Sequence, residues 1–446
     1  MYRTKVKHTL AILCFLLLAL SASAERVKVR LFSNNSIDLI NISFDLGSYD
    51  IQGSDTIVEA AVGNDKSVEL TPAGRKVHLA INGYDYGNHT SVNFLATDTA
   101  CILCLNPRNL KQRTYEGNLQ VTVGKNGKLL LINDVEFETY IAGVVQSEIY
   151  GDQADIFRVQ AIISRTWALK NINKHASEGY NFCDQVHCQA YLNRCVRPDI
   201  MLGTMMSSGM TIVDSLGHLI ETPFHANSGG QTANSEDVWR SAVPYLRSVP
   251  DTFSYHMRQS EWVKVVNEDK WLNYFSSKHK LDTHNDSIRN ELLTFSQSTR
   301  KVRICGIPLT RVRTDFQLRS TFFSVLYDSA AHRVTLSGHG FGHGVGLSQE
   351  GTIRMVGLGY SYDSIIRHYY TGAAVHYDET HPHNYVENYI QKIAQIIEED
   401  KSAATRSVSK KDDWLGRLFR IRDREEREEV YDPKTDDLDE DWLYDW

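Results

Sequence analysis

Glu148 is the first residue whose type and setting point to chemistry, because it ends the apolar stretch "YIAGVVQSEIY" (Tyr140–Tyr150). A carboxyl group beside valines and isoleucines loses hydration, and desolvation raises its pKa. A raised pKa is what a general acid needs near neutral pH. An acid at the end of a helix is otherwise simply solvated. The stretch by itself is compatible with both interpretations.

A second group of residues combines thiols and imidazoles. The segment "YNFCDQVHCQAY" brings Cys183, His187 and Cys188 close together in sequence, with His175 upstream. Zinc is bound in proteins by four ligands of these types in a tetrahedron. The competing hypothesis is a disulfide, either between Cys183 and Cys188 or between Cys195 and one of them.

Two glycine-rich segments are the remaining candidates. "GHGFGHGVGLSQEG" (Gly338–Gly351) holds six glycines and two histidines in fourteen residues, which predicts tight turns or close backbone approach. A phosphate-binding loop is disfavoured because no lysine follows the glycines. A metal site on His339 and His343 is disfavoured because a spacing of four residues shares a face only on a helix. "FHANSGGQTANSEDVW" (Phe224–Trp239) predicts a polar cleft, with a structural turn as the alternative.

The chain begins with the features of a secretory signal peptide. Basic residues precede the apolar run "AILCFLLLAL", and Ala22 and Ala24 form a cleavage site, so we expect a signal peptide at residues 1–24. The run is too short to span a bilayer, although a retained anchor is the alternative. We therefore expect an exported protein, periplasmic or associated with the cell wall, without a stable membrane span. The net charge of -7 argues against nucleic-acid binding.

The elements that position these residues can be predicted from periodicity. Short alternating runs such as "KVHLAI" and "LQVTVGKNGKLLLI" predict a β-rich region up to about Val135. A helix through "VEFETYIAGVVQSE", capped by Asn133 or Asp134, and a second helix through "QADIFRVQAIISRTWALKNI" follow. "SEWVKVV" and "IRNELLTF" are later helix candidates. The predicted fold class is α+β, with a β-rich N-terminal region and then a mixed α+β domain with a cleft.

Taken together and in order, these motifs resemble the SpoIID/LytB family. The resemblance rests on "VEFETYIAGVVQSEIY", "QAIISRTWAL", "CDQVHCQAY", "HANSGGQTANSEDVW", "PYLRSV" and "GHGFGHGVGLSQEG", and it covers roughly residues 113–372. Two positions depart from the family pattern. His339 stands where the family usually has an arginine, and Thr352 stands at the alanine of the family's "SQ-x-GA".

The resemblance implies a peptidoglycan lytic transglycosylase with Glu148 as the catalytic glutamate. Such an enzyme cleaves the bond between N-acetylmuramic acid (MurNAc) and N-acetylglucosamine (GlcNAc) and leaves 1,6-anhydro-MurNAc ends. The resemblance also implies a zinc ion bound by Cys183, His187 and Cys188, with His175 as the fourth ligand. We further expect a set of residues that contact the sugars or shape the cleft: Tyr191, Ser228, Gly229, Gln231, His343, Ser348 and Gln349.

Two other functions compete with this one. A non-catalytic relative would bind glycan strands and modify a cell-wall amidase. A glycoside hydrolase would need a second carboxylate, for which Glu236 or Asp237 are candidates. The expected organisation is a signal peptide at 1–24, a β-rich region at 25–112, a catalytic domain at 113–376, and an amphipathic helix with a charged, disordered tail at 377–446.

Overall fold

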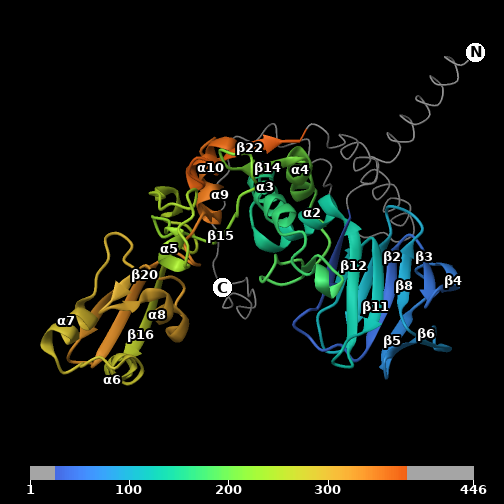
Figure 1. The fold of residues 1–446 in the computed structure, drawn as a ribbon, viewed down its shortest axis with the longest axis horizontal. Helices are drawn as coiled ribbons and strands as arrows, with labels where there is room; N and C mark the ends of the chain where they lie inside the picture. The colour runs from blue at the N-terminus through green and yellow to red at the C-terminus, as the bar shows by residue number, and fades with distance from the viewer. Residues whose placement is uncertain (1–25, 379–446) are drawn as a thin grey trace, which may run out of the picture. The chain divides into compact units, whose positions relative to one another are not determined.

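The structure is a computed structural model that describes residues 26–378. The predicted signal peptide lies outside these residues, as do the predicted helix and acidic tail after Asp378. The described chain divides into two compact units. The first comprises residues 26–150, 171–209 and 378, and the second comprises residues 151–170 and 210–377. Strands and helices are both abundant, so the predicted α+β class is confirmed (Figure 1).

The first unit is built on two sheets. The larger has the strand order β13-β1-β12-β11-β8-β3-β4, and the smaller has the order β10-β9-β2-β5-β6-β7. The strands of the larger sheet are β1 (Arg26–Leu31), β3 (Tyr49–Gly53), β4 (Thr56–Val62), β8 (Val92–Ala96), β11 (Asn118–Val123), β12 (Leu129–Glu136) and β13 (Phe182–Cys183). Those of the smaller sheet are β2 (Ile40–Leu46), β5 (Val68–Ala73), β6 (Lys76–Ile81), β7 (Tyr84–His89), β9 (Ile102–Pro107) and β10 (Arg113–Glu116).

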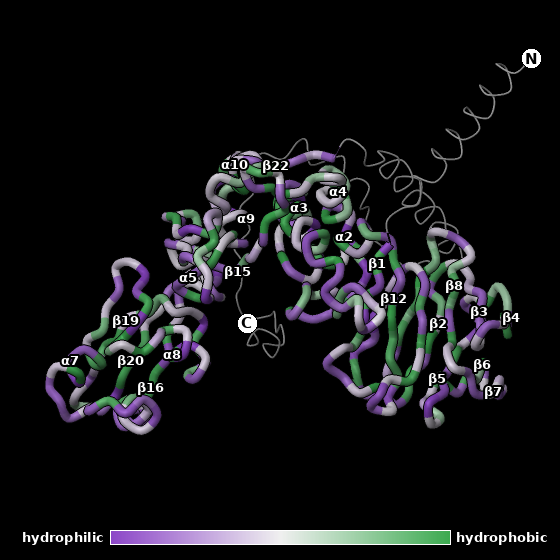
Figure 2. The backbone as a smooth tube through the Cα atoms, viewed as in Figure 1, coloured by the Kyte–Doolittle hydropathy of each residue, from purple (hydrophilic) through white to green (hydrophobic). Residues whose placement is uncertain are grey.

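Alternating side chains from both sheets form the core of this unit. In β1, Val27, Val29 and Leu31 are buried while the residues between them are more exposed, as the period of two in a strand requires. Phe44 of β2 packs on Phe94 of β8 with ring centroids 6.3 Å apart, so the two sheets share one core. Figure 2 shows the apolar stretches along these strands.

The strands on either side of residue 112 belong to the same sheets. β10 pairs with β9, and β11 pairs with both β8 and β12. The segment 113–136 is therefore structurally part of the β-rich region. The functional boundary expected at residue 112 stays a prediction.

Helix α2 (Phe137–Glu148) follows β12 directly (Figure 1). The predicted caps are wrong, because β12 continues through Glu136 and places Asn133 inside the sheet. There the Asn133 side chain donates to the backbone carbonyls of Glu116 and Asn118 at 2.8 and 3.0 Å. The first unit also holds the short helix η1 (Ala176–Glu178) and helix α4 (Pro198–Met206).

The second unit combines helices with small sheets. Its helices are α3 (Ala154–Lys170), α5 (Ser235–Val238), η2 (Thr252–Ser254), α6 (Glu268–Asn273), η3 (Tyr274–Lys278), α7 (Asp286–Thr294), α8 (Leu309–Phe316), α9 (Gln349–Gly357) and α10 (Tyr362–Tyr369). Its strands are β14 (Met210–Val213), β15 (Phe224–His225), β16 (Glu261–Asn267), β17 (Arg303–Ile304), β18 (Ile307–Pro308), β19 (Phe323–Asp328), β20 (Arg333–His339), β21 (Leu347–Ser348) and β22 (Ala374–Tyr377). No helix within residues 26–378 has the length and apolar character needed to cross a membrane.

One predicted helix of the second unit is a strand. "SEWVKVV" forms β16, in which Trp262 and Val266 are buried while Val263 and Val265 are exposed. β-branched residues in a two-residue alternation favour a strand. The strand pairs with β20, which pairs with β19. The second candidate, "IRNELLTF", is helical as α7.

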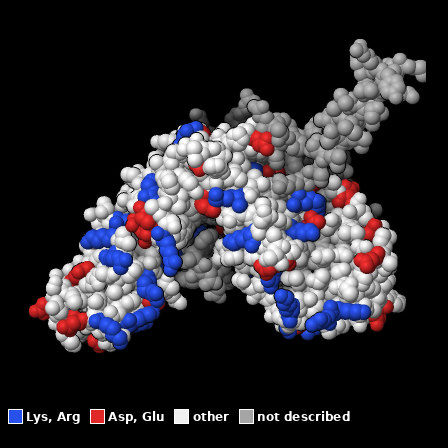
Figure 3. Space-filling model, in the orientation of Figure 1, with Lys and Arg blue, Asp and Glu red and all other residues white. Residues whose placement is uncertain are grey.

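Charges of both signs are mixed over the surface seen in Figure 3. Some of them form exposed ion pairs, such as Arg367 with Asp363 at 2.7 Å. An exposed pair of this kind contributes at most about 1 kcal/mol. The stability of each unit therefore depends mainly on its apolar core.

The two glycine-rich segments of the second unit pair with each other. β15 and β21 run parallel, with Phe224 opposite Leu347 and His225 opposite Ser348. Asn227 and Phe341 exchange two backbone hydrogen bonds of 3.1 and 2.8 Å. Main-chain hydrogen bonds thus hold the glycine-rich loop along the Phe224–Trp239 segment.

Glycine is required where the two backbones approach each other most closely. Gly346 has φ +71°, and a Cβ on it would lie 2.2 Å from the carbonyl oxygen of Pro223. At Gly340 a Cβ would lie 2.6 Å from the carbonyl oxygen of Asn227. The close backbone approach expected from the glycines is therefore an approach between two loops of the protein.

We expect Gly346→Ala to destabilise the second unit by about 2–4 kcal/mol, because the new methyl group meets a backbone carbonyl in a left-handed conformation. Gly359→Ala is the matched control. Gly359 has φ +83° but open space around it, so only about 1–2 kcal/mol should be lost. All four tryptophans of the described chain lie in this unit, so denaturant unfolding followed by tryptophan fluorescence measures the difference. Equal losses in the two variants would contradict the packing argument.

Candidate functional site

Glu148 is the last residue of α2, and its side chain is partly buried. The preceding helix is buried from Phe137 to Val145. This desolvation raises the pKa of Glu148 to about 7. The backbone N–H of Ala190 donates to Glu148 Oε1 at 2.6 Å and acts in the opposite direction, because it stabilises the ionised form. Near neutral pH both protonation states are populated, as a group that gives and retakes a proton requires.

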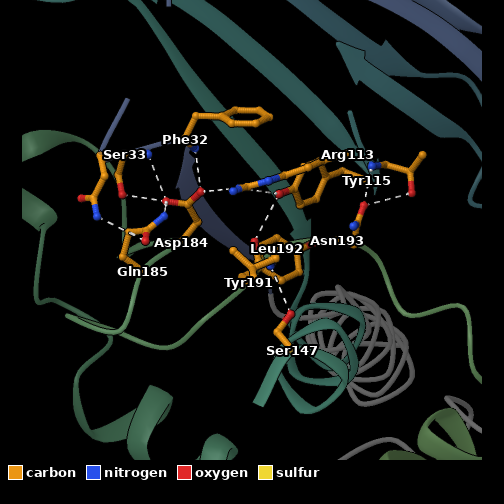
Figure 4. A network of polar contacts seen from close by, with 12 residues as sticks. Phe32, Ser33, Arg113, Tyr115, Ser147, Asp184, Gln185, Tyr191, Leu192 and Asn193 are labelled. Carbon is orange, nitrogen blue, oxygen red and sulfur yellow. Dashed lines mark hydrogen bonds and ion pairs between the residues drawn. The ribbon is translucent and has the colours of Figure 1, made fainter. Parts of the chain in front are cut away.

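The loop that carries Ala190 begins at a buried carboxylate, Asp184. One oxygen, Oδ2, accepts from the backbone N–H of Phe32 at 2.6 Å and from Arg113 Nη1 at 2.8 Å. The other, Oδ1, accepts from the backbone N–H of Ser33 at 3.0 Å and from its hydroxyl at 2.6 Å (Figure 4). The Arg113 guanidinium also lies 4.4 Å above the Phe32 ring. A buried charge needs such complete pairing, and the start of the loop is fixed to β1 and β10 as a result.

Tyr191, which we expected to contact sugar, is fully buried. Its ring packs on Tyr115 and Tyr140 with centroids 5.2 and 5.1 Å away. Its hydroxyl donates to Asn133 Oδ1 at 3.2 Å. The packing places Tyr191 in the core beneath the loop, and its contact with sugar stays a prediction.

The four predicted metal ligands converge in the first unit. Their ligand atoms all lie within 4.8 Å of one another, although the residues come from η1, β13 and the turn that follows β13. Cys183 Sγ is 3.7 Å from His187 Nδ1, and Cys188 Sγ is 3.5 Å from His175 Nε2. A group of two thiols and two imidazoles at these separations can hold a metal ion.

A further hydrogen bond orients His175 in the way that is common for histidine ligands of metal ions. His175 Nδ1 donates to the carboxylate of Glu178 at 2.6 Å, which leaves Nε2 directed at Cys188. Such a bond fixes the tautomer that presents the other nitrogen to a metal. All six cysteines of the described residues are unpaired, so neither of the alternative disulfides is formed.

Ser228 and Ser348 meet within the second unit, at the buried Asp251. The Ser228 hydroxyl donates to Asp251 Oδ2 at 2.7 Å. Ser254 donates to the same oxygen, and its hydroxyl lies 2.8 Å from that of Ser348. Both predicted sugar ligands are completely buried. Their hydroxyls join the two glycine-rich segments, and their contact with sugar stays a prediction.

His343 is also engaged inside the protein. Its Nδ1 accepts from the backbone N–H of Val345 at 3.0 Å. Burial, followed by the charge of Arg313, lowers the pKa of His343 to about 3, so the ring is neutral. His343 therefore makes a buried hydrogen bond within its own loop, and its contact with sugar stays a prediction. His339, its neighbour in the motif, contributes backbone against which Gly229 packs.

The remaining predicted sugar ligands hold neighbouring segments of the same unit. The partly buried Gln231 donates to Ser248 Oγ at 3.0 Å and accepts from the backbone N–H of Arg300 at 3.1 Å. Gln349 lies buried, with its Nε2 3.4 Å from Gln160 Oε1. Their contact with sugar stays a prediction.

Both candidates for a second carboxylate are occupied. Glu236 forms a two-pronged ion pair with Arg247, whose hydrogen bonds hold the pKa of that carboxyl well below its usual range. Asp237 accepts from the side chain of Asn234 at 2.9 Å.

Several residues around Glu148 escaped sequence reasoning. The Ala190 N–H is a backbone group, which no residue type reveals. Asp184 was visible as the only acid within "CDQVHCQAY", but its partners Arg113 and Phe32 lie far away in sequence. Only the folded sheets bring them together.

Comparisons with known proteins agree with the geometry. A family model described as stage II sporulation protein matches residues 125–205, which contain Glu148 and all four Cys/His residues. The stage II sporulation protein D of Bacillus subtilis is 24% identical over 260 residues, covering 55% of this chain and 75% of that protein.

Two further relatives extend the comparison. An uncharacterised protein of Brachyspira hyodysenteriae is 25% identical over 268 residues, covering 58% of this chain and 72% of its own length. An amidase enhancer of Bacillus subtilis is 26% identical over 213 residues, covering 36% of this chain and 30% of the enhancer. The motifs, the α+β fold and these matches agree with one another and support the resemblance to the SpoIID/LytB family.

Proposed function

We propose that the protein is a peptidoglycan lytic transglycosylase in which Glu148 acts first as acid and then as base. The observation that carries this proposal is the partly buried carboxyl group with a pKa near 7, which accepts a hydrogen bond from the Ala190 N–H. The substrate is the glycan strand, cut between MurNAc and GlcNAc.

The chemistry needs only this one carboxyl group. Neutral Glu148 gives its proton to the glycosidic oxygen as the bond to the MurNAc anomeric carbon breaks. The C6 hydroxyl of the same MurNAc attacks that carbon, and the Glu148 carboxylate takes up the hydroxyl proton. The products are a 1,6-anhydro-MurNAc end and a free GlcNAc hydroxyl, with no water consumed. Because the substrate supplies the nucleophile, the second carboxylate of a hydrolase is unnecessary.

The occupied state of the alternative carboxylates supports this mechanism over hydrolysis. Glu236 is committed to Arg247, and Asp237 to Asn234. The similarity to a protein named amidase enhancer favours one further candidate function, a glycan-binding modifier of a cell-wall amidase. That role needs no proton transfer, whereas the environment of Glu148 is suited to proton transfer.

The wider expectations are part of the same proposal. The catalytic region spans residues 113–376, and the protein acts after export, in the periplasm or at the cell wall. A cell-wall amidase is the proposed protein partner.

Glu148→Gln should lower the rate of glycan cleavage by about 10²–10⁴-fold or more, because the amide has no proton to transfer. Wild-type cleavage should fall as the pH rises through about 7, since the acid must be protonated. Release of soluble fragments from purified peptidoglycan measures both effects. Glu69→Gln, at an exposed position of β5, is the control and should cleave normally. Full activity of Glu148→Gln would refute the assignment.

We infer that His175, Cys183, His187 and Cys188 hold one structural zinc ion. A site with four protein ligands has no open position for substrate, so the metal would stabilise the fold and take no part in proton transfer. It would join η1 to the turn after β13, close in sequence to the loop that contacts Glu148.

Purified protein should contain about one zinc per chain, and chelation should lower the midpoint of thermal unfolding, because metal binding is coupled to local folding. Cys183→Ser should lose the metal. Cys305→Ser should keep it, since that half-buried thiol lies in the second unit. Elemental analysis and thermal unfolding provide the measurements. Metal-free protein with unchanged stability would contradict the zinc proposal.

A further inference from the structure

We propose that Gln146 and Ser147 are positioning residues that clamp the loop 190–196 along the last turn of α2, and so place the Ala190 N–H on Glu148. This inference rests on the proposed role of Glu148. It assigns a function to the two residues that precede the acid in sequence.

Three consecutive residues of α2 bind alternate residues of the same loop. Glu148 accepts from the N–H of Ala190, and the Ser147 hydroxyl accepts from the N–H of Leu192 at 3.1 Å. Gln146 completes the series with both ends of its amide. Its Nε2 donates to the carbonyl of Arg194 at 3.0 Å, and its Oε1 accepts from the N–H of Val196 at 2.7 Å. An extended chain presents every second residue to one side, so Gln146, Ser147 and Glu148 all form hydrogen bonds with the same edge of the loop.

The Ser147 hydroxyl has a defined direction. It donates to the carbonyl of Gly143, one turn earlier in the helix, at 2.8 Å. Its proton is therefore used within the helix, and its lone pair faces the N–H of Leu192. Gln146 is fixed as well, because it must donate at one end and accept at the other.

Gly143 shows how closely the loop lies against the helix. A Cβ at this position would be 2.4 Å from the Tyr191 ring and 2.8 Å from the carbonyl oxygen of Asn193. Glycine within a helix is less favourable than alanine. The close approach of the loop explains why glycine is nevertheless present, and it is independent of the hydrogen bonds.

β10 holds the other edge of the loop. The N–H of Thr114 donates to Asn193 Oδ1, and the N–H of Arg194 donates to the carbonyl of Thr114, both at 2.7 Å. Tyr115 donates to the carbonyl of Tyr191 at 3.2 Å (Figure 4). The loop is thus hydrogen-bonded to β10 on one side and to α2 on the other. Only the hydrogen bonds to α2 lie beside Glu148.

The consequence for the acid is orientation. When Glu148 is neutral, an N–H directed at Oε1 favours the proton on the other oxygen, Oε2. It also fixes the plane of the carboxyl group. If Gln146 and Ser147 release the loop, Glu148 loses this partner, and a misplaced acid transfers its proton more slowly.

The test compares Gln146→Leu, Ser147→Ala and the double variant with two controls. Gln120→Leu removes a Gln hydrogen bond to Asn93 on β8, and Ser48→Ala removes a hydroxyl contact to Thr97. We expect kcat to fall about 10-fold in each single variant and about 100-fold in the double variant, with KM within two-fold of wild type. Ser147→Thr keeps the hydroxyl and should restore kcat. The controls should match wild type in kcat, and all variants should unfold at nearly the same denaturant concentration, because each lost hydrogen bond contributes little to global stability.

The pH profile adds a readout that a purely structural role would not move. The Ala190 N–H favours ionised Glu148, so its loss should shift the alkaline limb of the profile to higher pH. Wild-type kcat and an unshifted profile in the double variant would overturn the proposal. Loss of bound metal in that variant would also overturn it, because the effect would then arise at the Cys/His cluster.

Amide hydrogen exchange separates this inference from the proposed function. In the full-length protein without substrate, the double variant should exchange faster than wild type at Ala190, Leu192 and Val196. A wild-type protein that cuts no glycan would end the proposed function, while this exchange pattern would still report the clamp. Unchanged exchange at Ala190 would refute the clamp even in an active enzyme.

Discussion

The buried Asp184 carboxylate is the constraint on which the geometry around Glu148 depends. It accepts four hydrogen bonds from Phe32, Ser33 and Arg113, so a movement of this buried carboxylate would break them. Because Asp184 begins the loop that delivers the Ala190 N–H, the β-rich region helps to set the position of the acid. The N-terminal strands are therefore part of the site as well as its neighbour in sequence.

In the second unit, a buried carboxylate likewise holds separate segments together. Its two glycine-rich segments are joined by main-chain pairing and by hydroxyl groups that gather at Asp251. Glycine permits the approach, and the serines satisfy the buried carboxylate. The polar composition of these two motifs suggests ligand contacts, but many of their polar side chains form hydrogen bonds within the unit.

Local patterns predicted much of the fold. The alternation in "KVHLAI", the β-hairpin in "LQVTVGKNGKLLLI" and the helix through Ile156 and Val159 all follow from periodicity. "SEWVKVV" was misassigned because a short run with a lysine fits both periods, and pairing with β20 decides between them.

The candidate site was predictable only where side-chain type carries the chemistry. The clustering of His175, Cys183, His187 and Cys188 was predicted in this way, and the role of Glu148 stays a proposal. The burial of Tyr191, Ser228 and Ser348 was not predicted, because it depends on which strands and loops cover a residue. The partners of Asp184 lie at positions 32, 33 and 113, so long-range folding alone reveals them.

The central claim is that one acid and no water perform the cleavage, and the chemical nature of the new glycan ends tests it most directly. Purified protein should be incubated with peptidoglycan strands, and the fragments analysed by mass spectrometry without prior reduction. We expect 1,6-anhydro-MurNAc ends, which are lighter by one water than reducing ends. Fragments that end only in reducing MurNAc would show hydrolysis and contradict the proposed mechanism.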